Sequence, residues 1–190
     1  MEEKTKARIM DATKIRRVLA RVATEIIERN RNLKNLVIVG VKTRGIAIGK
    51  RVAHLVKEIE GVDIPIGILD ITRYRDDVPA LRSKKASLEQ AEIGFPVAKK
   101  DVLLVDDVLM TGRTIRAALD ALFDRGRPQS IQLVVLIDRG HRELPIRPDY
   151  VGKVLPTSRR EVVRVRLKEM DGSEEVIIAE PVKISGGRKR

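Results

Sequence analysis

One stretch of the chain, residues 102–114 with the sequence VLLVDDVLMTGRT, constrains the fold more than any other. Its first four residues are apolar and predict a buried strand of a parallel sheet, and two adjacent aspartates follow them. Beyond residue 114, apolar residues recur with helical spacing at Ile115, Ala118, Leu119, Leu122 and Phe123. A strand, an acidic pair, a turn of small residues and a helix therefore follow one another. This order is typical of an α/β protein whose ligand binds beyond the carboxyl ends of the strands.

The turn between this strand and this helix carries the groups that hold a phosphate. Backbone N–H groups at a helix N-terminus point towards an anion, and the helix dipole favours negative charge there. Gly112 lets the backbone come close, and the hydroxyls of Thr111 and Thr114 can donate hydrogen bonds. Asp106 and Asp107 would repel the phosphate, so we expect them to bind ribose hydroxyls directly or through Mg²⁺. The competing interpretation is an ordinary strand–turn–helix with two solvated aspartates.

The composition of the 190-residue chain limits its class and location. The chain has no cysteine, which excludes disulfides, thiolate metal sites and a cysteine nucleophile. No apolar segment approaches the roughly 20 residues needed to cross a bilayer, and the first residues lack the apolar core of a signal peptide. We therefore expect a cytoplasmic protein without membrane contact.

The net charge of +12 favours polyanionic partners such as nucleotides or RNA. The positive charge is concentrated in residues 1–34 and 139–168. A solvated surface that is rich in charges of both signs explains this positive net charge as well as binding to nucleic acid does.

Periodicity predicts an alternation of strands and helices along most of the chain. The predicted strands are residues 36–41, 64–71, 102–105 and 131–137, and the predicted helices begin near residues 11, 45 and 113 and end near 30, 58 and 125. This alternation predicts a doubly wound parallel sheet.

The remaining segments are predicted from turn residues and from composition. Residues 76–97 are expected to form a long mobile loop with a strand at either side, and loops of this length are usually functional. Periodicity fails in residues 138–158, which contain three prolines. Residues 161–167 and 175–179 alternate and predict a hairpin joined at Asp171-Gly172. We expect one domain over residues 1–182 and a disordered basic tail at residues 183–190.

A second loop, residues 39–45 with the sequence VGVKTRG, also lies where a predicted strand ends and a helix begins. Its two glycines have the spacing of a Walker A loop, but Ile46 and Ala47 stand where lysine and serine or threonine are required. The sequence therefore excludes a P-loop nucleoside triphosphatase. Lys42, Arg44 and the amides of the loop can still hold a pyrophosphate.

Residues 102–114 closely resemble the motif that binds phosphoribosyl pyrophosphate (PRPP) in type I phosphoribosyltransferases. Residues 69–77 (LDITRYRDD) and 138–153 (DRGHRELPIRPDYVGK) extend the resemblance to the PyrR family, and it covers about residues 8–180. Members of this family are uracil phosphoribosyltransferases that also bind the messenger RNA of pyrimidine operons. The resemblance implies an α/β fold of the type I phosphoribosyltransferase kind. Its central, mostly parallel sheet is flanked by helices, and it adds a flexible flap and a C-terminal hood or hairpin.

The resemblance also implies roles for individual residues. The residues implied to bind PRPP or nucleotide are Lys42, Thr43, Arg44, Gly45, Asp106, Asp107, Val108, Met110, Thr111, Gly112, Arg113 and Thr114. Those implied in catalysis are Asp106, Asp107, Arg44 and Arg73, and those implied in the hood over the base are Arg139 and Val163. Those implied to contact RNA are Arg21, His141, Arg142, Arg147, Lys153 and Arg159. Mg²⁺ is expected to be carried mainly by PRPP, with Asp106 and Asp107 as candidate protein ligands.

The implied reaction joins uracil to PRPP and releases uridine monophosphate (UMP) and pyrophosphate. UMP is then expected to favour the state that binds pyr mRNA and attenuates transcription, in a homodimer or homotetramer. Ala20, Thr24 and Val154 stand where the family usually has Thr, His and Asn on the RNA side, so altered RNA specificity is expected. Two alternatives remain. One is a phosphoribosyltransferase for another base, such as hypoxanthine, guanine or orotate, and the other is a non-catalytic nucleotide-sensing RNA-binding protein.

Overall fold

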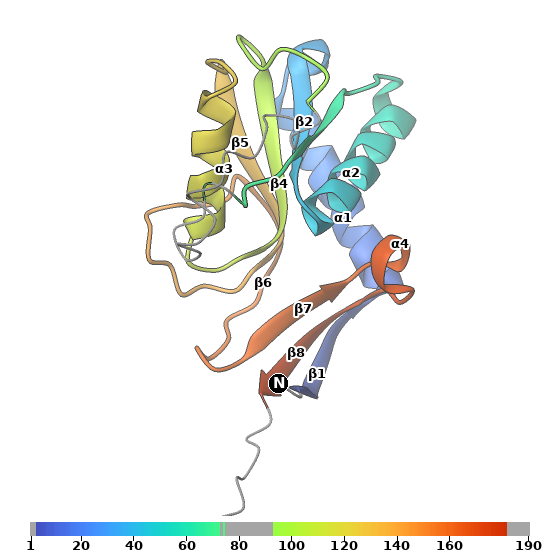
Figure 1. The fold of residues 1–190 in the computed structure, drawn as a ribbon. Helices are drawn as coiled ribbons and strands as arrows, with labels where there is room; N and C mark the ends of the chain where they lie inside the picture. The colour runs from blue at the N-terminus through green and yellow to red at the C-terminus, as the bar shows by residue number, and fades with distance from the viewer. Residues whose placement is uncertain (1–2, 73, 75–92, 182–190) are drawn as a thin grey trace, which may run out of the picture.

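The computed structural model describes residues 3–72, 74 and 93–181. Over these residues the chain forms a five-stranded sheet flanked by helices, with a three-stranded sheet beneath it (Figure 1). Arg73, most of the predicted loop at residues 76–97 and the predicted tail at residues 183–190 lie outside the described residues.

The larger sheet is parallel throughout, which confirms the predicted fold class. Its strands, in their spatial order, are β3 (Ile66–Leu69), β2 (Leu36–Val41), β4 (Asp101–Leu109), β5 (Ser130–Asp138) and β6 (Tyr150–Val154). The central strands are almost continuously apolar because both faces of the sheet are covered.

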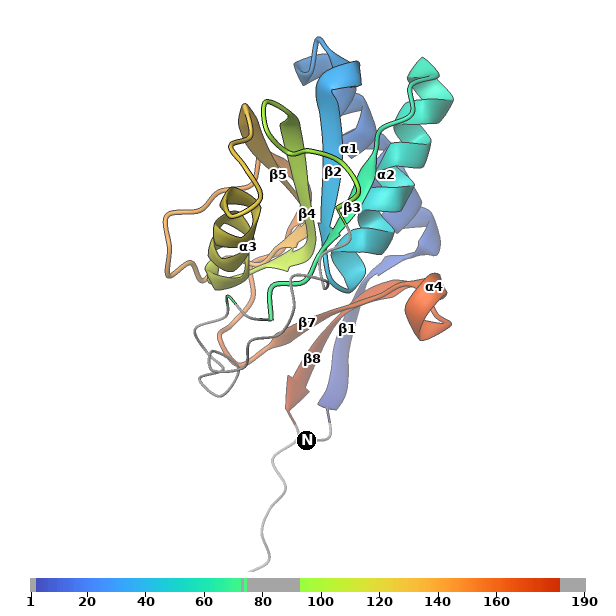
Figure 2. The ribbon, with the colours of Figure 1, turned by 45° about the horizontal axis from the view of Figure 1, so that its top comes forward.

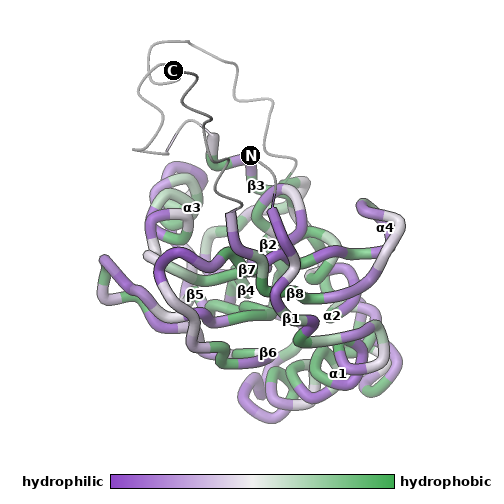
Figure 3. The backbone as a smooth tube through the Cα atoms, turned by 90° about the horizontal axis from the view of Figure 1, so that it is seen from below, coloured by the Kyte–Doolittle hydropathy of each residue, from purple (hydrophilic) through white to green (hydrophobic). Residues whose placement is uncertain are grey.

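Helices cover the two faces of this sheet. α1 (Ala12–Arg29) and α2 (Arg44–Glu60) lie on one face and α3 (Arg113–Phe123) on the other (Figure 2). Successive side chains of a strand point to opposite faces, so Leu103 packs with α1 and α2 and Leu104 packs with α3. A short 3₁₀ helix, η1 (Leu33–Asn35), precedes β2. Figure 3 shows the hydrophobic positions concentrated on the central strands.

The smaller sheet is antiparallel and joins the two ends of the described chain. Its order is β1 (Glu3–Asp11), β8 (Glu175–Pro181) and β7 (Val162–Arg166), and α4 (Lys168–Asp171) connects β7 to β8. Lys6 on β1 pairs with Glu161 at 2.6 Å and with Glu180 at 3.0 Å. The hairpin predicted near residues 161–179 is confirmed, although a helical turn rather than a tight turn joins its strands.

Local predictions were wrong at three places. β4 continues to Leu109, so the acidic pair lies inside the strand and not after it. The segment without periodicity contains β6, and the charged first residues form β1. Both missed strands lie at the edge of their sheets, where the hydrophobic pattern is weakest. Among the described residues, no helix is long and apolar enough to cross a membrane.

Candidate active site

The strand order places a crevice between the carboxyl ends of β2 and β4. The helix after β2 leads to β3 and the helix after β4 leads to β5, so the connections diverge from these adjacent strands. Ligands of open α/β sheets bind at such a switch point. A polar cavity of about 400 Å³ lies there, lined by Val41, Lys42, Thr43, Asp70, Ile71, Thr72, Asp106, Asp107, Val108 and Thr114.

The acidic pair forms one wall of this cavity. Asp106 is only 7% exposed, and its Oδ1 accepts the backbone N–H of Asp107 at 3.0 Å. Asp107 Oδ1 accepts the backbone N–H of Val108 at 2.9 Å. Burial, together with the neighbouring charge of Asp107, raises the pKa of Asp106. Burial also raises the pKa of Asp107, although Arg44 partly opposes this shift. Two carboxyl groups with raised pKa values in a cleft are typical of a functional site.

The loop after β2 forms the opposite wall. Its Lys42–Thr43 peptide bond is cis, and the Nζ of Lys42 lies 3.2 Å from Asp70 Oδ2. Gly45 follows in the first turn of α2, where an added Cβ would lie 2.2 Å from the carbonyl oxygen of Val105. Only glycine therefore allows the start of α2 to pack directly on β4 beside the acidic pair.

Arg44 lies between the acidic pair and the smaller sheet. Its Nη2 donates to Asp171 Oδ1 at 2.7 Å, and its Nε is buried without a hydrogen-bond partner in the described part of the chain. Arg44 does not line the cavity itself, but its charge lowers the pKa of Asp107. Its guanidinium thus links α4 electrostatically to the acidic pair.

The turn before α3 has the expected shape for an anion site. Gly112 caps α3 with φ of +92°, a left-handed conformation that favours glycine. The carbonyl oxygen of Thr111 accepts the N–H groups of Glu143 and Leu144, which fixes the turn against the segment after β5. Of this turn, Thr114 lines the cavity, whereas the Nε of Arg113 points away to Glu143 at 2.7 Å.

The site contains two residues that the sequence analysis did not select, Asp70 and Thr72. Asp70 Oδ1 accepts both the N–H and the hydroxyl of Thr72, at 2.9 and 2.5 Å. Burial raises the pKa of Asp70, but the hydrogen bonds from Thr72 and Lys42 outweigh this effect and the pKa lies below its usual value. The available signal was their position at the carboxyl end of the strand predicted over residues 64–71, at the edge of the sheet that carries the other loops.

Comparison with known proteins agrees with this geometry. Residues 7–170 match the phosphoribosyl transferase domain family. The chain is 58% identical over 175 residues to the bifunctional protein PyrR of Pelotomaculum thermopropionicum, covering 92% of this chain and 96% of that protein. It is 55% identical over 176 residues to the bifunctional protein PyrR of Deinococcus radiodurans, covering 93% and 96%. The chain belongs to the PyrR family. The resemblance to bifunctional uracil phosphoribosyltransferases and pyrimidine regulators is thereby confirmed.

Solved structures of similar fold have low sequence identity to this PyrR-family chain. A hypoxanthine phosphoribosyltransferase variant of Trypanosoma cruzi superposes with a TM-score of 0.73 at 19% identity, covering 93% of this chain and 96% of that one. A hypoxanthine-guanine phosphoribosyltransferase of Bacillus anthracis gives 0.70 at 15% identity, covering 95% and 100%. At this identity the likeness supports the fold, namely that of type I phosphoribosyltransferases.

The two predicted hood residues lie away from the cavity lining. Arg139 is 5% exposed, and it donates from Nε to Thr157 Oγ1 at 3.1 Å and from Nη2 to the carbonyl of Ser158 at 3.0 Å. Val163 is buried in β7 and packs in the core between the two sheets. Their role towards the base stays a prediction.

The residues predicted to contact RNA divide into two groups. Arg21 and Arg142 are held internally, Arg21 by the carbonyls of Val151 and Gly152 at 2.7 and 2.8 Å, and Arg142 by Asp138 Oδ2 at 2.6 Å. The remaining cations, Arg147, Lys153 and Arg159, are exposed. His141 is half-buried, and its Nε2 lies 2.5 Å from the carbonyl of Thr157. The guanidinium groups of Arg21 and Arg142 are therefore held by the chain, although Arg21 is itself exposed, whereas no hydrogen bond or ion pair within the described residues holds the side chains of Arg147, Lys153 and Arg159.

The donor set at the cavity suits a metal that arrives with the substrate. Among the described residues, no cluster of three or more metal-ligating side chains exists. Mg²⁺ is commonly held by one or two protein carboxylates together with substrate phosphates. Asp106 and Asp107, which both line the cavity, meet this limited requirement.

Proposed function

We propose that the cavity between β2 and β4 binds PRPP and that the protein transfers its phosphoribosyl group to uracil. One observation carries this proposal: the acidic pair, the loop after β2 and the N-terminus of α3 converge on one polar cavity at a switch point. The turn at residues 111–114 would hold the 5′-phosphate. Asp106 and Asp107 would hold the ribose hydroxyls, and Lys42 and its loop the pyrophosphate.

The reaction is a displacement at the anomeric carbon. The bond from this carbon to the pyrophosphate oxygen breaks as N1 of uracil forms a new bond to it, and the N1 proton is lost. Positive charge develops on the ribose, where the acidic pair can stabilise it. Lys42 and Arg44 can stabilise the departing pyrophosphate, so positioning and electrostatics account for most of the catalysis. When bound with PRPP, Mg²⁺ supplies neutralisation of the pyrophosphate charge, and Asp106 and Asp107 are the residues that would hold it.

The first test measures product formation from PRPP, Mg²⁺ and each of uracil, hypoxanthine, guanine and orotate. Turnover with uracil alone is the expected result. Faster turnover with another base would contradict the assignment of uracil. Tight binding of PRPP or UMP without turnover of any base would instead favour the nucleotide-sensing alternative.

We also propose that the protein with UMP bound regulates transcription by binding pyr mRNA. The exposed cations Arg147, Lys153 and Arg159 support this part, because contacts to phosphate dominate RNA affinity. UMP can favour the RNA-binding state only if it binds that state more tightly than the other. A gel shift with and without UMP, repeated at two salt concentrations, tests the claim. Equal affinity for unrelated hairpins would reduce it to nonspecific attraction of a polyanion.

A further inference from the structure

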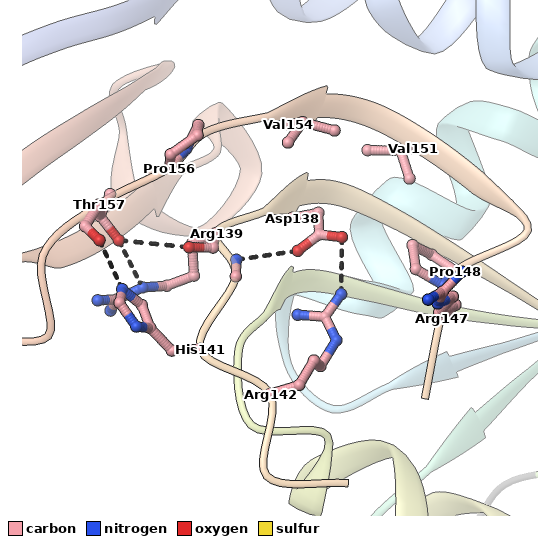
Figure 4. Close-up of a pocket in the computed structure, with 11 residues that line it drawn as sticks. Asp138, Arg139, His141, Arg142, Arg147, Pro148, Val151, Val154, Pro156 and Thr157 are labelled. Carbon is pink, nitrogen blue, oxygen red and sulfur yellow. Dashed lines mark hydrogen bonds and ion pairs between the residues drawn. The ribbon is translucent and has the colours of Figure 1, made fainter. Parts of the chain in front are cut away.

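A second hollow, of about 540 Å³, lies beside the edge strand β6. Residues of β6 and the segment after it form one side, and the segment that follows β5 forms the other (Figure 4). Most of the exposed area of its lining is apolar, and Pro148, Val151, Val154 and Pro156 are its apolar residues. Val154 is 63% exposed, although a valine at the end of a strand is usually covered. The hollow shares no lining residue with the PRPP cavity.

Arg142 and Asp138 form an ion pair in the floor of this hollow. Arg142 donates to Asp138 Oδ2 at 2.6 Å and to the carbonyls of Ile146 and Met110 at 2.8 and 2.9 Å. Asp138 Oδ1 also accepts the N–H of Gly140 at 3.0 Å. Arg139 also lines the hollow, and its guanidinium donates only to neutral groups, Thr157 Oγ1 and the carbonyl of Ser158. The floor is therefore a fixed polar network in which one carboxylate faces two guanidinium groups.

Arg147 at the rim differs from these residues. It is exposed, and it forms no hydrogen bond or ion pair with the described part of the chain. A guanidinium group can stack on a flat π system and donate hydrogen bonds from its edge. Opposite it, Val151 and Val154 offer apolar surface. A flat ligand with apolar faces and a polar edge would satisfy both sides at once.

We propose that this hollow takes one unpaired nucleobase of the RNA, and this proposal rests on the proposed RNA-binding function. Proteins read single-stranded RNA by removing bases from the stack and packing them against flat or apolar side chains. Pockets that hold small ligands span roughly 300–1,000 Å³, so a volume of about 540 Å³ admits a base with part of its ribose. The exposed Lys153 is the neighbour of Val154 and can hold an adjacent phosphate. RNA would then be recognised by base shape at a position where phosphate contacts alone give no discrimination.

The experiment uses the full chain with UMP and two RNA probes of equal length. One is a stem-loop that carries the fluorescent base 2-aminopurine at one loop position at a time, and the other is a fully paired duplex. We expect the fluorescence to change at one loop position and not in the duplex. Replacing the base at that position by an abasic site is expected to weaken binding about tenfold, the effect of losing one stacked base.

Val154→Asp is the decisive variant, because it places a charge against one face of the base. We expect it to weaken stem-loop binding about tenfold. The abasic RNA should then bind this variant almost as tightly as the intact stem-loop does, because two changes at one contact are not additive in a double-mutant cycle. Ile59→Asp is the matched control. Ile59 is 53% exposed on α2, does not line the hollow and undergoes the same charge change. Thermal unfolding checks that both variants fold.

The possible results separate the two proposals. If Val154→Asp and Ile59→Asp weaken stem-loop and duplex binding to the same small extent, the base pocket is wrong and the RNA-binding function stands. If the unaltered protein binds neither RNA even at low salt, the regulatory part of the proposed function fails and the base pocket fails with it. If the abasic site weakens binding to Val154→Asp as much as it weakens binding to the original protein, the base lies elsewhere on the surface and the pocket is overturned.

Discussion

The two hollows of this protein are built in opposite ways. The PRPP cavity is polar, lies at the switch point of the sheet and is formed mainly by residues that follow strands in short, local motifs. The hollow beside β6 is mainly apolar, lies at a sheet edge and is lined by a single stretch of the chain, residues 138–157. The difference shows how one fold can separate two tasks. Fixed backbone geometry suits a small, highly charged substrate, whereas an open edge with exposed side chains suits a large partner.

The largest expected effect is on catalysis in the PRPP cavity, and it separates catalysis from RNA binding most clearly. Asp107→Asn keeps the shape of the side chain and removes its charge, so we expect kcat/KM for UMP formation to fall about 100-fold or more. The change also removes repulsion with Asp106, so the midpoint of thermal unfolding should not fall. Nearly normal activity would show that Asp107 does not act on the ribose. RNA binding, measured with UMP at a concentration that saturates the variant, should remain within about twofold of the original in the same preparation.

Gly45→Ala is expected to damage the PRPP cavity through packing alone. The added methyl group would meet the carbonyl of Val105 at 2.2 Å, and such overpacking costs about 1–3 kcal/mol. Urea denaturation measures the free energy of unfolding, and UMP formation should fall with it because α2 and its loop must shift. Gly94→Ala is the matched control, since a Cβ there meets no atom within 4 Å. Equal stability of the two variants would contradict the close contact.

Asp171→Asn tests whether the smaller sheet supports the PRPP cavity. The change removes the charged partner of Arg44. An ion pair that is partly exposed contributes only a small interaction free energy, so we expect KM for PRPP to rise about two- to fivefold with little change in kcat. Glu174→Gln is the control, because it weakens an ion pair of Arg51 on the same helix without touching the loop at the cavity. If both variants raise KM equally, the effect comes from general loosening of the smaller sheet.

The smallest effect concerns the stability of the fold in acid and depends on Glu161, whose Oε2 accepts the N–H of Ser158, the residue after Thr157 of the second hollow. Lys6 and the N–H of Ser158 hold the pKa of Glu161 at about 2, below its ordinary value of 4.5. A lowered pKa stabilises the fold above pH 4.5, and this contribution disappears as the pH falls from 4.5 to about 2. Unfolding of the original protein and of Glu161→Gln at a series of pH values should give a stability difference that shrinks over this range. A constant difference would contradict the assignment. UMP formation at neutral pH should be equal in both proteins.

Local patterns predicted the parts of the molecule that depend on local physics. The buried strands are continuous apolar runs, and the acidic pair with the turn after it is a single motif. Four residues of this motif, Asp106, Asp107, Val108 and Thr114, line the cavity, although β4 continues to Leu109 and the Nε of Arg113 donates to Glu143. The sequence also favoured the correct sheet, because strands and helices alternate.

The missed features depend on contacts that no local pattern contains. β1 has only one buried side chain, Met10, because its other face meets solvent and ion pairs. The hydrogen bonds from Arg21 to carbonyls 130 and 131 residues away were not predicted, and its implied contact with RNA stays a prediction. The link between Arg44 and Asp171 likewise spans 127 residues. Such pairings appear only once the topology is known.

The register of the smaller sheet has a consequence for how the protein is made. Glu3 pairs with Pro181, and Asp11 pairs with Glu175, so the strand that the ribosome produces first is joined to the last described strand. The parallel sheet contains no residue of β1 and can assemble while synthesis continues. β1, in contrast, has no neighbour in its sheet until β8 emerges, because β8 is the strand that joins it to β7. Closure of this sheet therefore waits for β8, and a nascent chain arrested before residue 175 would carry β1 as an unpaired, charged strand.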